Sequence, residues 1–175
     1  SGDRKLPKPA TQKSQSLLAY LVIHRYAPPQ TREFLSSLFW GDRPASKARA
    51  SLATALWHIH RCLPGDLILA EGETVQFDPQ ADICIDVDEF TACLNTNDAS
   101  AVNRYRGDLL DGFYDDWIVE ERYRLEDLYC EALVRLMSDH EAAGRFQDAL
   151  ATATRLLHRD PLREDAHRLV MRANC

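Results

Sequence analysis

Five side chains that can contact an anion recur along Pro44–Pro64 at the spacing of one helix face. Successive members are four, three, four and three residues apart, so in a helix of 3.6 residues per turn they align along one side. The set contains cations, hydroxyls and an imidazole, with no carboxylate between them: Lys47, Ser51, Thr54, His58 and Arg61. Such a stripe, named here the polar stripe, favours binding of an anion such as a phosphate backbone.

The other side of the same segment predicts how the polar stripe is held. Its apolar residues recur at steps of four, three and four: Leu52, Leu56, Ile59 and Leu63. This spacing is typical of a buried helix face, and it falls almost diametrically opposite the polar stripe. We therefore expect one helix over residues 44–64, with an apolar face in a core and a polar face outside.

The flanking segments predict a small fold around this helix. An earlier amphipathic segment is stopped by Pro28, Thr31 fits the N-cap of a second short helix, and Gly41 fits its end. After the third helix, two strand-like runs around Gly72 predict a β-hairpin. Three helices and a hairpin are the parts of a winged helix-turn-helix, which presents its third helix to the DNA major groove.

The composition is that of a soluble globular protein. Of 175 residues, 45% are hydrophobic and 27% are charged, and no apolar run approaches the roughly 20 residues that span a bilayer. The first residues lack the apolar core of a signal peptide, so we expect a cytoplasmic protein without membrane contact. The five cysteines show no CxxC spacing, which indicates reduced thiols.

Charges are unevenly distributed along the chain. Residues 1–66 contain ten Lys and Arg and four Asp and Glu, a net charge of +6, whereas residues 67–175 contain eleven and twenty-three, a net charge of −12. Opposite signs in the two halves suggest two domains. The field near a contact face governs phosphate binding, so the total charge of −6 does not exclude a DNA partner.

The second half predicts helices. Residues 79–85 form a linker that could hold one more strand, and Asp86 with Glu89 resembles a capping box at the start of a helix. A shorter helix is expected over residues 99–105. A Gly- and Asp-rich loop then leads into a long helix, in which Glu120 is spaced to pair with Arg124.

The end of the chain shows the spacing of a helical repeat. Gly144, Ala149 and Pro161 fall at the relative offsets of the tetratricopeptide repeat, where small residues let two antiparallel helices approach. Trp117 and Tyr123 of the long helix are expected in the core. With no strand signal after about residue 85, the second half reads as an all-α domain.

Other clusters are weaker candidates for chemistry. His58 and Cys62 are one helical turn apart, but His60 points elsewhere, which leaves only two aligned ligands for zinc. The carboxylates between Asp108 and Glu121 are explained by loop turns and helix capping. GxGxxG, GxxxxGKS/T and GxSxG patterns are absent. We therefore expect no enzyme, no metal site and no cofactor.

Several longer motifs occur in a characteristic order. The first half contains SLLAYLV, FLSSLFWGD and ARASLATALWHIHRCLP, and the second contains DVDEF, RYRGDLLDGFYDDWIVEERYRLEDLY, AAGRFQDAL and RDPLREDAHRLVMR. With these motifs the chain resembles the bacterial transcriptional activator domain family, of the SARP-like type in which such a domain follows an OmpR-type winged helix.

The resemblance implies a mainly α protein with two domains. Residues 1–80 would form the winged helix-turn-helix, and residues 81–175 the TPR-like helical activator domain. Winged helices of this type usually begin with a small β-sheet. The roughly ten residues before Thr11 are few for it, so either the sheet precedes this sequence or, as we expect, it is lacking.

The function implied is a DNA-binding transcriptional regulator. Its third helix would read the major groove of double-stranded DNA through the polar stripe, while further cations reach phosphates: Arg43, Lys13 and Arg49. The helical domain would mediate contacts with a second copy, in a homodimer, or with a regulatory partner domain.

An alternative stays open: the chain is a protein-interaction and regulatory module of a larger signalling protein that does not bind DNA. It is favoured by Ala53, His58 and His60, where relatives often carry arginine. Carboxylates of Glu71 and Glu73 at the hairpin tip would also be repelled by phosphates.

Overall fold

The computed structural model describes residues 8–96 and 98–173. Over these residues the chain is mainly helical, with eight helices and one three-stranded sheet. It divides into two compact units, of which unit 1 ends at Ile83 and unit 2 begins at Cys84. No helix in the described ranges combines the length and apolarity needed to cross a membrane.

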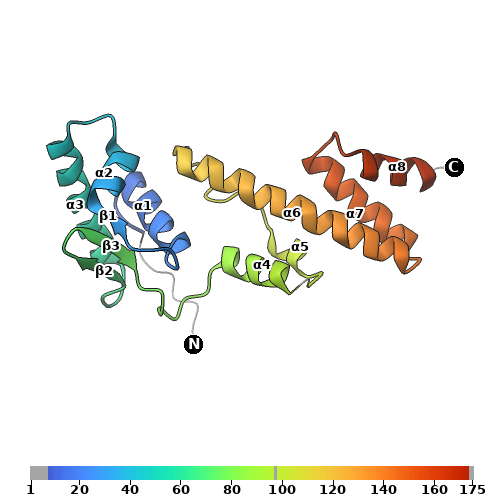
Figure 1. Ribbon diagram of the computed structural model, residues 1–175, viewed down its shortest axis with the longest axis horizontal. Helices are drawn as coiled ribbons and strands as arrows, with labels where there is room; N and C mark the ends of the chain where they lie inside the picture. Colours follow the sequence, from blue (N-terminus) through green and yellow to red (C-terminus); the bar gives the residue numbers. More distant parts are fainter. Residues whose placement is uncertain (1–7, 97, 174–175) are drawn as a thin grey trace. The chain divides into compact units, whose positions relative to one another are not determined.

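Unit 1 contains three helices, and hydrogen bonds explain where two of them begin. The helices are α1 (Gln12–Ile23), α2 (Arg32–Trp40) and α3 (Ala45–Cys62) (Figure 1). The hydroxyl oxygen of Thr11 accepts a hydrogen bond from the Ser14 backbone N–H at 3.1 Å. Thr31 accepts one from the Phe34 N–H at 3.1 Å, so its predicted N-cap role is confirmed. Each cap satisfies a donor that the first helical turn leaves unpaired.

Gly41 follows α2 as expected, but its backbone is right-handed, with φ of −62°. A positive φ, which glycine adopts easily, is therefore not the reason for glycine at this position. A Cβ atom here would lie 2.6 Å from the carbonyl oxygen of Ser37. The close approach of that carbonyl is the reason that glycine suits the end of α2.

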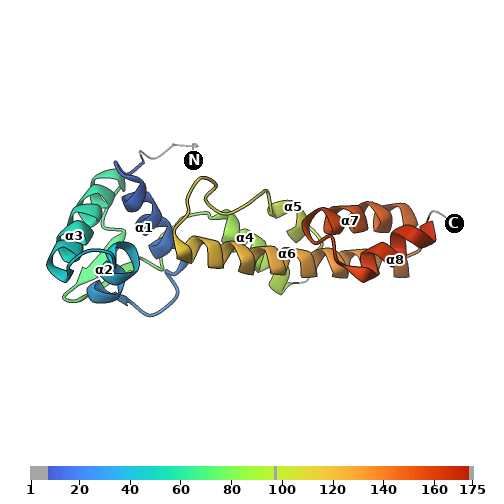
Figure 2. The same ribbon diagram turned by 90° about the horizontal axis from the view of Figure 1, so that it is seen from above.

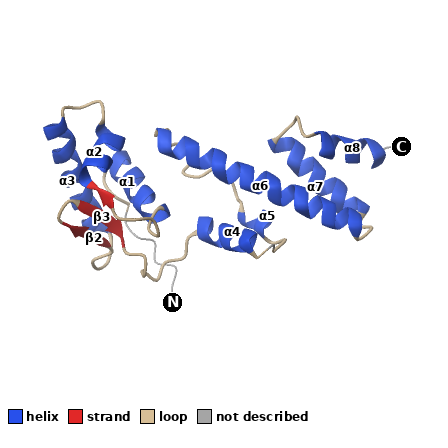
Figure 3. Cartoon of the chain, in the orientation of Figure 1, coloured by secondary structure: helices blue, strands red, loops and turns tan. Residues whose placement is uncertain are grey.

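The sheet of unit 1 joins segments from both ends of its sequence. It consists of β1 (Gln30–Thr31), β2 (Ile68–Glu71) and β3 (Thr74–Phe77), antiparallel in the order β1-β3-β2 (Figure 3). The predicted hairpin is confirmed, and Gly72 takes a positive φ of 54° in its turn. Strand β1 was not predicted, because two residues are too short to show alternation. The further strand considered at residues 79–85 is wrong, since this described segment is irregular.

The helices and strands of unit 1 enclose one core. Helices α1 and α2 both pack on α3, and the least exposed large apolar side chains come from helices and strands alike: Leu17, Leu21, Leu35, Leu52, Ile59, Val75 and Phe77. The apolar face of α3 is buried as predicted as far as Ile59. Leu63 is only half-buried, because α3 ends at Cys62 and Leu63 has an extended backbone.

Helices are the regular secondary structure of unit 2 over its described residues, and loops connect them. Its elements are α4 (Asp86–Asn95), α5 (Ala101–Arg104), α6 (Asp116–Ala142), α7 (Phe146–Arg159) and α8 (Glu164–Ala173). Helix α7 packs along α6, and α8 packs on α7 (Figure 2). Leu133 of α6 and Ala149 and Ala153 of α7 have no exposed surface and share one core. The expectation that small residues let the two helices approach is thus confirmed for Ala149.

The start of α4 differs from the prediction. Its N-cap position is Ile85, and Asp86 is already the first helical residue, with its carboxylate accepting a hydrogen bond from the Val87 N–H at 2.9 Å. Glu89 contacts Cys84 and Arg104 instead of the backbone before the helix. The proposed capping box is therefore wrong.

Two predicted details of α6 are also wrong. Arg124 forms its ion pair with Glu121, three residues earlier, and not with Glu120. Tyr123 is 65% exposed, whereas Trp117 is buried as expected. Spacing along a helix allows Arg124 either partner, and packing against other elements decides which side of the helix is buried.

Candidate nucleic-acid interface

The polar stripe lies on α3, as predicted, but its members differ in exposure. Lys47, Thr54 and Arg61 are exposed, while Ser51 and His58 are only half-exposed. On the buried side, two alanines join the predicted leucine and isoleucine residues: Ala48, Leu52, Ala55, Leu56 and Ile59. The two alanines shift the centre of the buried face toward Ser51 and His58. Ser51 and His58 of the polar stripe are therefore at one edge of the exposed face, whereas Arg61 stays nearly opposite the core.

The middle of the exposed face combines one member of the polar stripe with apolar side chains. With about 100° between successive residues of a helix, Ala50, Trp57 and Arg61 lie opposite the buried face. Ala53 and Thr54 flank them, and all of these residues are exposed. Trp57 has 53% of its surface accessible. The sequence places Trp57 at the flank of the polar stripe and favours its packing against the helical domain over stacking on a DNA sugar. Ala50 was not predicted as an interface residue, because its side chain has no polar group.

A shallow depression of about 400 Å³ lies between the start of α1 and the side of α3. Five of the eight predicted interface residues line it: Lys13, Arg43, Ser51, Thr54 and His58. Thr11, Ser14 and Trp40 are among the other lining residues. The fold thus brings Lys13, far away in sequence, next to the polar stripe, and the depression combines two cations with several hydroxyls.

Hydrogen bonds already engage the hydroxyls of this depression. Ser51 Oγ donates to the Lys47 carbonyl oxygen at 2.9 Å and accepts from Arg43 Nη1 at 3.1 Å. Thr54 Oγ1 donates to the carbonyl oxygen of Ala50 at 3.0 Å. Each hydroxyl must rotate before it can donate to a phosphate. Arg43 keeps further N–H donors, since a guanidinium has five.

Four of the predicted cations have no acidic partner. Within the residues that the structure describes, Arg43, Lys47, Arg49 and Arg61 form no ion pair. The Arg61 guanidinium lies 4.8 Å from the centre of the Trp57 ring, a cation–π distance. Arg49 is exposed but projects from the other edge of α3, away from the depression. It is not part of the polar stripe.

The tip of the hairpin is tied to the start of α2. The Arg32 backbone N–H donates to the Glu73 carbonyl oxygen at 2.8 Å, and Arg32 Nε donates to the Gly72 carbonyl oxygen at 3.0 Å. Glu71 and Glu73 are exposed. The sequence showed no sign of the role of Arg32, because its partners lie about 40 positions away.

The charge of unit 1 is smaller than the sequence division at residue 66 suggested. Up to Ile83 the chain contains ten Lys and Arg and eight Asp and Glu, a net charge of +2, and from Cys84 onward it contains eleven and nineteen, a net charge of −8. Four carboxylates after residue 66 belong to unit 1. The net charges of the two units still have opposite signs. The basic character of α3 is local, because unit 1 as a whole carries only a small positive charge.

Side chains that could bind a metal ion, and thiols, occur in both units. No three His, Cys, Asp or Glu side chains in the described ranges gather closely enough to hold a metal ion. Cys62, Cys84, Cys93 and Cys130 are free thiols, and Cys175 lies outside the described residues. The pKa of the Cys84 thiol is raised, mainly by its hydrogen bond to Glu89, and a raised pKa makes a thiol less reactive.

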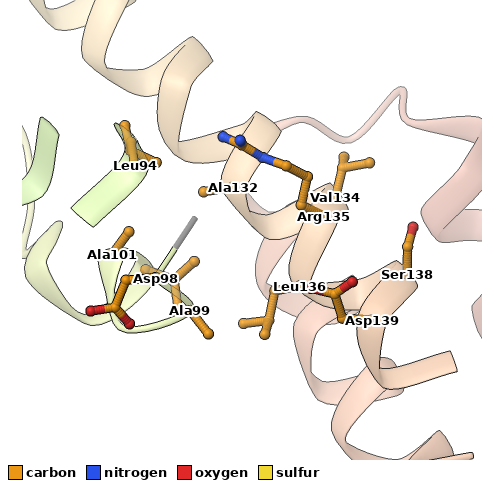
Figure 4. A pocket seen from close by; sticks show the side chains of 11 residues that line it. Leu94, Asp98, Ala99, Ala101, Ala132, Val134, Arg135, Leu136, Ser138 and Asp139 are labelled. Carbon is orange, nitrogen blue, oxygen red and sulfur yellow. The ribbon is translucent and has the colours of Figure 1, made fainter. Parts of the chain in front are cut away.

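Unit 2 has a separate pocket of about 400 Å³ between the α4–α5 segment and α6. Its floor is apolar, with Leu94, Ala101 and Ala132, and its rim carries Asp98 and Asp139. Figure 4 shows the half-buried side chain of Leu136 reaching from α6 toward Ala99. The hydroxyl and N–H of Ser100 both hydrogen-bond the Asp98 carboxylate. An apolar side chain of another molecule suits this pocket better than acid–base chemistry does.

Comparisons with known proteins agree with the helical architecture of unit 2. A sequence model described as the bacterial transcriptional activator domain matches residues 88–175, about half of the chain. A search of curated proteins found no match.

Proposed function

The chain belongs to the bacterial transcriptional activator domain family, and we propose that it is a DNA-binding transcription regulator whose unit 1 is a winged helix-turn-helix. The family is one of transcription regulators and not of enzymes. In this proposal α3 enters the major groove of double-stranded DNA. The protein acts in the cytoplasm, where its DNA target is found.

The order of elements in unit 1 supports this proposal. A short helix, α2, directly precedes α3, and the β2–β3 hairpin directly follows it. Helix-turn-helix proteins place the second helix of such a pair in the groove, while the first crosses the DNA backbone. The hairpin tip next to the start of α2 is then in the position of a wing.

The observation that carries the proposal is a set of three cations around α3 that have no acidic partner among the described residues. Lys47 and Arg61 project from opposite ends of the exposed face of α3, and Arg43 lines the adjacent depression. Cations without acidic partners can neutralise phosphates without first breaking an ion pair, and each neutralised phosphate releases condensed counterions.

Unit 2 is proposed to mediate contacts with a second copy or with a regulatory partner. Helix-turn-helix proteins often bind paired half-sites as dimers. Light scattering of the whole chain at several concentrations tests the homodimer, for which we expect a mass that rises to twice that of the chain. A constant monomer mass would exclude it.

Fluorescence anisotropy tests DNA binding. The whole chain is titrated into labelled random duplex DNA at about 50 and about 200 mM salt, and binding should weaken steeply between them. The double variant Lys47→Ala/Arg61→Ala should lower the slope of log K against log salt by about two, one for each lost phosphate contact. At 0.1 M salt this corresponds to roughly ten- to a hundredfold weaker binding.

A matched variant controls for net charge. Arg106→Ala/Arg168→Ala removes the same charge from exposed positions of unit 2 and should leave the salt slope unchanged. If both double variants reduce binding equally, the attraction is nonspecific and α3 is not the interface. No binding at 50 mM salt, with the fold intact by circular dichroism, would exclude the proposal.

A second candidate function has its own observation. The exposed face of α3 carries the apolar residues Ala50, Ala53 and Trp57, and the hairpin tip carries Glu71 and Glu73. Under this alternative unit 1 binds a protein and no DNA, and the pocket at Leu136 takes a side chain of that partner. Under this alternative the chain belongs to a larger signalling protein, and pull-downs with other domains of that protein should capture it. Capture should be lost in the Leu136→Lys variant. DNA binding should be absent even at low salt.

A further inference from the structure

We infer that α3 selects its DNA sequence mainly through the methyl groups of thymine, and not through hydrogen bonds to base edges. The inference rests on the proposed function, because it requires α3 to lie in the major groove. It starts from Ala50, Ala53 and Trp57, the apolar residues of the exposed face. They are named here the apolar reading face.

The chemistry of this face restricts what it can recognise. Bases are read in the major groove by Arg or Lys on guanine, by Asn or Gln on adenine, and by apolar groups on the thymine methyl. Ala50 and Ala53 offer only methyl groups. Trp57 offers a large apolar ring with a single N–H donor. The apolar reading face therefore lacks every side chain that makes a two-bond contact with a base.

The polar groups nearby do not change this conclusion. The proton of the Thr54 hydroxyl is donated to the Ala50 carbonyl oxygen at 3.0 Å. The Arg61 guanidinium shares the exposed face but is stacked 4.8 Å from the Trp57 ring centre at the C-terminal end of α3, and Lys47 lies near the N-terminal end. Along the helix axis the two cations thus lie beyond Ala50, Ala53 and Trp57. We assign them to phosphates, which position a protein on DNA without reading its sequence.

The size of the apolar reading face suits a short run of bases. Ala50 and Trp57 are seven residues apart in the sequence, a rise of about 10 Å along a helix. Base pairs are stacked about 3.4 Å apart, so this length is comparable to three of them. We expect two or three positions of the selected site to be thymine on one strand or the other.

Replacing thymine by uracil tests the inference, because uracil lacks only the methyl group. A site is first selected from random duplex DNA with the whole chain, and its thymines are then exchanged one at a time. Each contacted methyl should contribute about fourfold in affinity, the effect expected for burying one such group. The same exchange outside the site, or in random duplex, should have no effect.

A variant of α3 provides an independent test. Ala50→Gln adds a side chain that pairs with adenine in two hydrogen bonds, and glutamine is well tolerated in an exposed helix. Repeated selection should yield adenine at one position that carried thymine, and that position should no longer respond to uracil. Ala151→Gln, at an exposed position of α7, should select the original site.

The outcomes separate this inference from the proposed function. If uracil and thymine sites bind equally and binding remains salt-dependent, methyl recognition is wrong while DNA binding stands. If the chain binds no duplex at 50 mM salt, both are wrong. A selected site without thymine would also overturn the inference.

Discussion

The two units contain almost the same number of basic residues but use them differently. Unit 1 has ten and unit 2 has eleven. In unit 2, six arginines form ion pairs with carboxylates of the same unit: Arg104, Arg124, Arg145, Arg159, Arg163 and Arg172. Around α3, among the described residues, Arg43, Lys47 and Arg61 have no such partner. The count of cations therefore says less about function than their partners do.

The difference follows from the carboxylates. Unit 2 has nineteen Asp and Glu, and unit 1 has eight, none of which falls within α3. An exposed ion pair contributes little to stability, about 0–1 kcal/mol, but it neutralises the field that would attract a phosphate. Paired cations in unit 2 should therefore attract a phosphate weakly, whereas the cations around α3 should attract it more strongly.

The largest expected effect tests whether the units are independent. Leu133 of α6 is fully buried in a core made only of unit 2 residues. Leu133→Ala should lower the free energy of unfolding of unit 2 by about 2–5 kcal/mol, because it removes apolar contacts and leaves a cavity. Urea unfolding followed by circular dichroism measures this loss.

In the same Leu133→Ala protein, DNA affinity in the absence of urea should change less than twofold. Leu162→Ala is the control for stability, since Leu162 is 87% exposed and its replacement should cost less than about 0.5 kcal/mol. A large loss of DNA binding in Leu133→Ala, with unit 2 still folded, would show that the two units do not act separately.

A smaller effect separates a structural arginine from a binding one. Arg155 Nη2 donates to the Val102 carbonyl oxygen at 2.9 Å and to the Tyr129 hydroxyl at 3.0 Å, joining α7 to α5 and α6. Arg155→Ala should destabilise unit 2 by about 1–2 kcal/mol, because charged hydrogen bonds are lost, and should leave DNA affinity unchanged. The exposed Arg106 serves as control, with no stability loss expected in Arg106→Ala. If Arg155→Ala weakened DNA binding instead, the proposed division between structural arginines in unit 2 and binding cations around α3 would be wrong.

The carboxylates of the hairpin tip test repulsion of DNA, in contrast to the attraction expected from the cations around α3. Replacing Glu71 and Glu73 by Gln removes two carboxylates from the proposed wing and should strengthen DNA binding about two- to threefold at 50 mM salt. At 200 mM the gain should vanish, because screening shortens the range of the repulsion. Anisotropy titrations measure both, with Glu131→Gln of α6 as control. A gain that persists at high salt would mean that the tip touches the DNA.

The smallest effect concerns pH and unit 2. The pKa of the Glu89 carboxyl is lowered, first by the hydrogen bond from the Cys84 thiol and then by the charge of Arg104. A pKa that is lower in the folded state stabilises the fold above the unfolded-state pKa, and this contribution is lost as pH falls through the folded-state pKa. Between about pH 5 and pH 3, the Tm of Glu89→Gln should therefore fall less than the Tm of the unmodified chain.

Calorimetric scans at several pH values measure this dependence, and Glu131→Gln again serves as control. A curve for Glu89→Gln that matches the unmodified chain would show that the Cys84–Glu89–Arg104 contacts do not persist in solution.

Local information was enough to predict most elements. The N-cap at Thr31, the hairpin turn at Gly72 and the small residue Ala149 between α6 and α7 depend on residues close in sequence, and the structure confirms them. The family of unit 2 was also recognisable, because its motifs lie in continuous segments. Caps, turns and helix periods arise from backbone geometry within a few residues.

The orientation of α3 and the partners of its cations were decided by tertiary packing. Periodicity predicts the residues that share a helix face, but the burial of Ala48 and Ala55 turns that face and moves Ser51 and His58 to its edge. The approach of Lys13 to the polar stripe and of Arg32 to the hairpin joins segments far apart in the chain. Such contacts depend on how the core closes, which no local pattern encodes. The sequence alone thus determined the elements and the family, and the tertiary structure decided which side chains α3 offers to a partner.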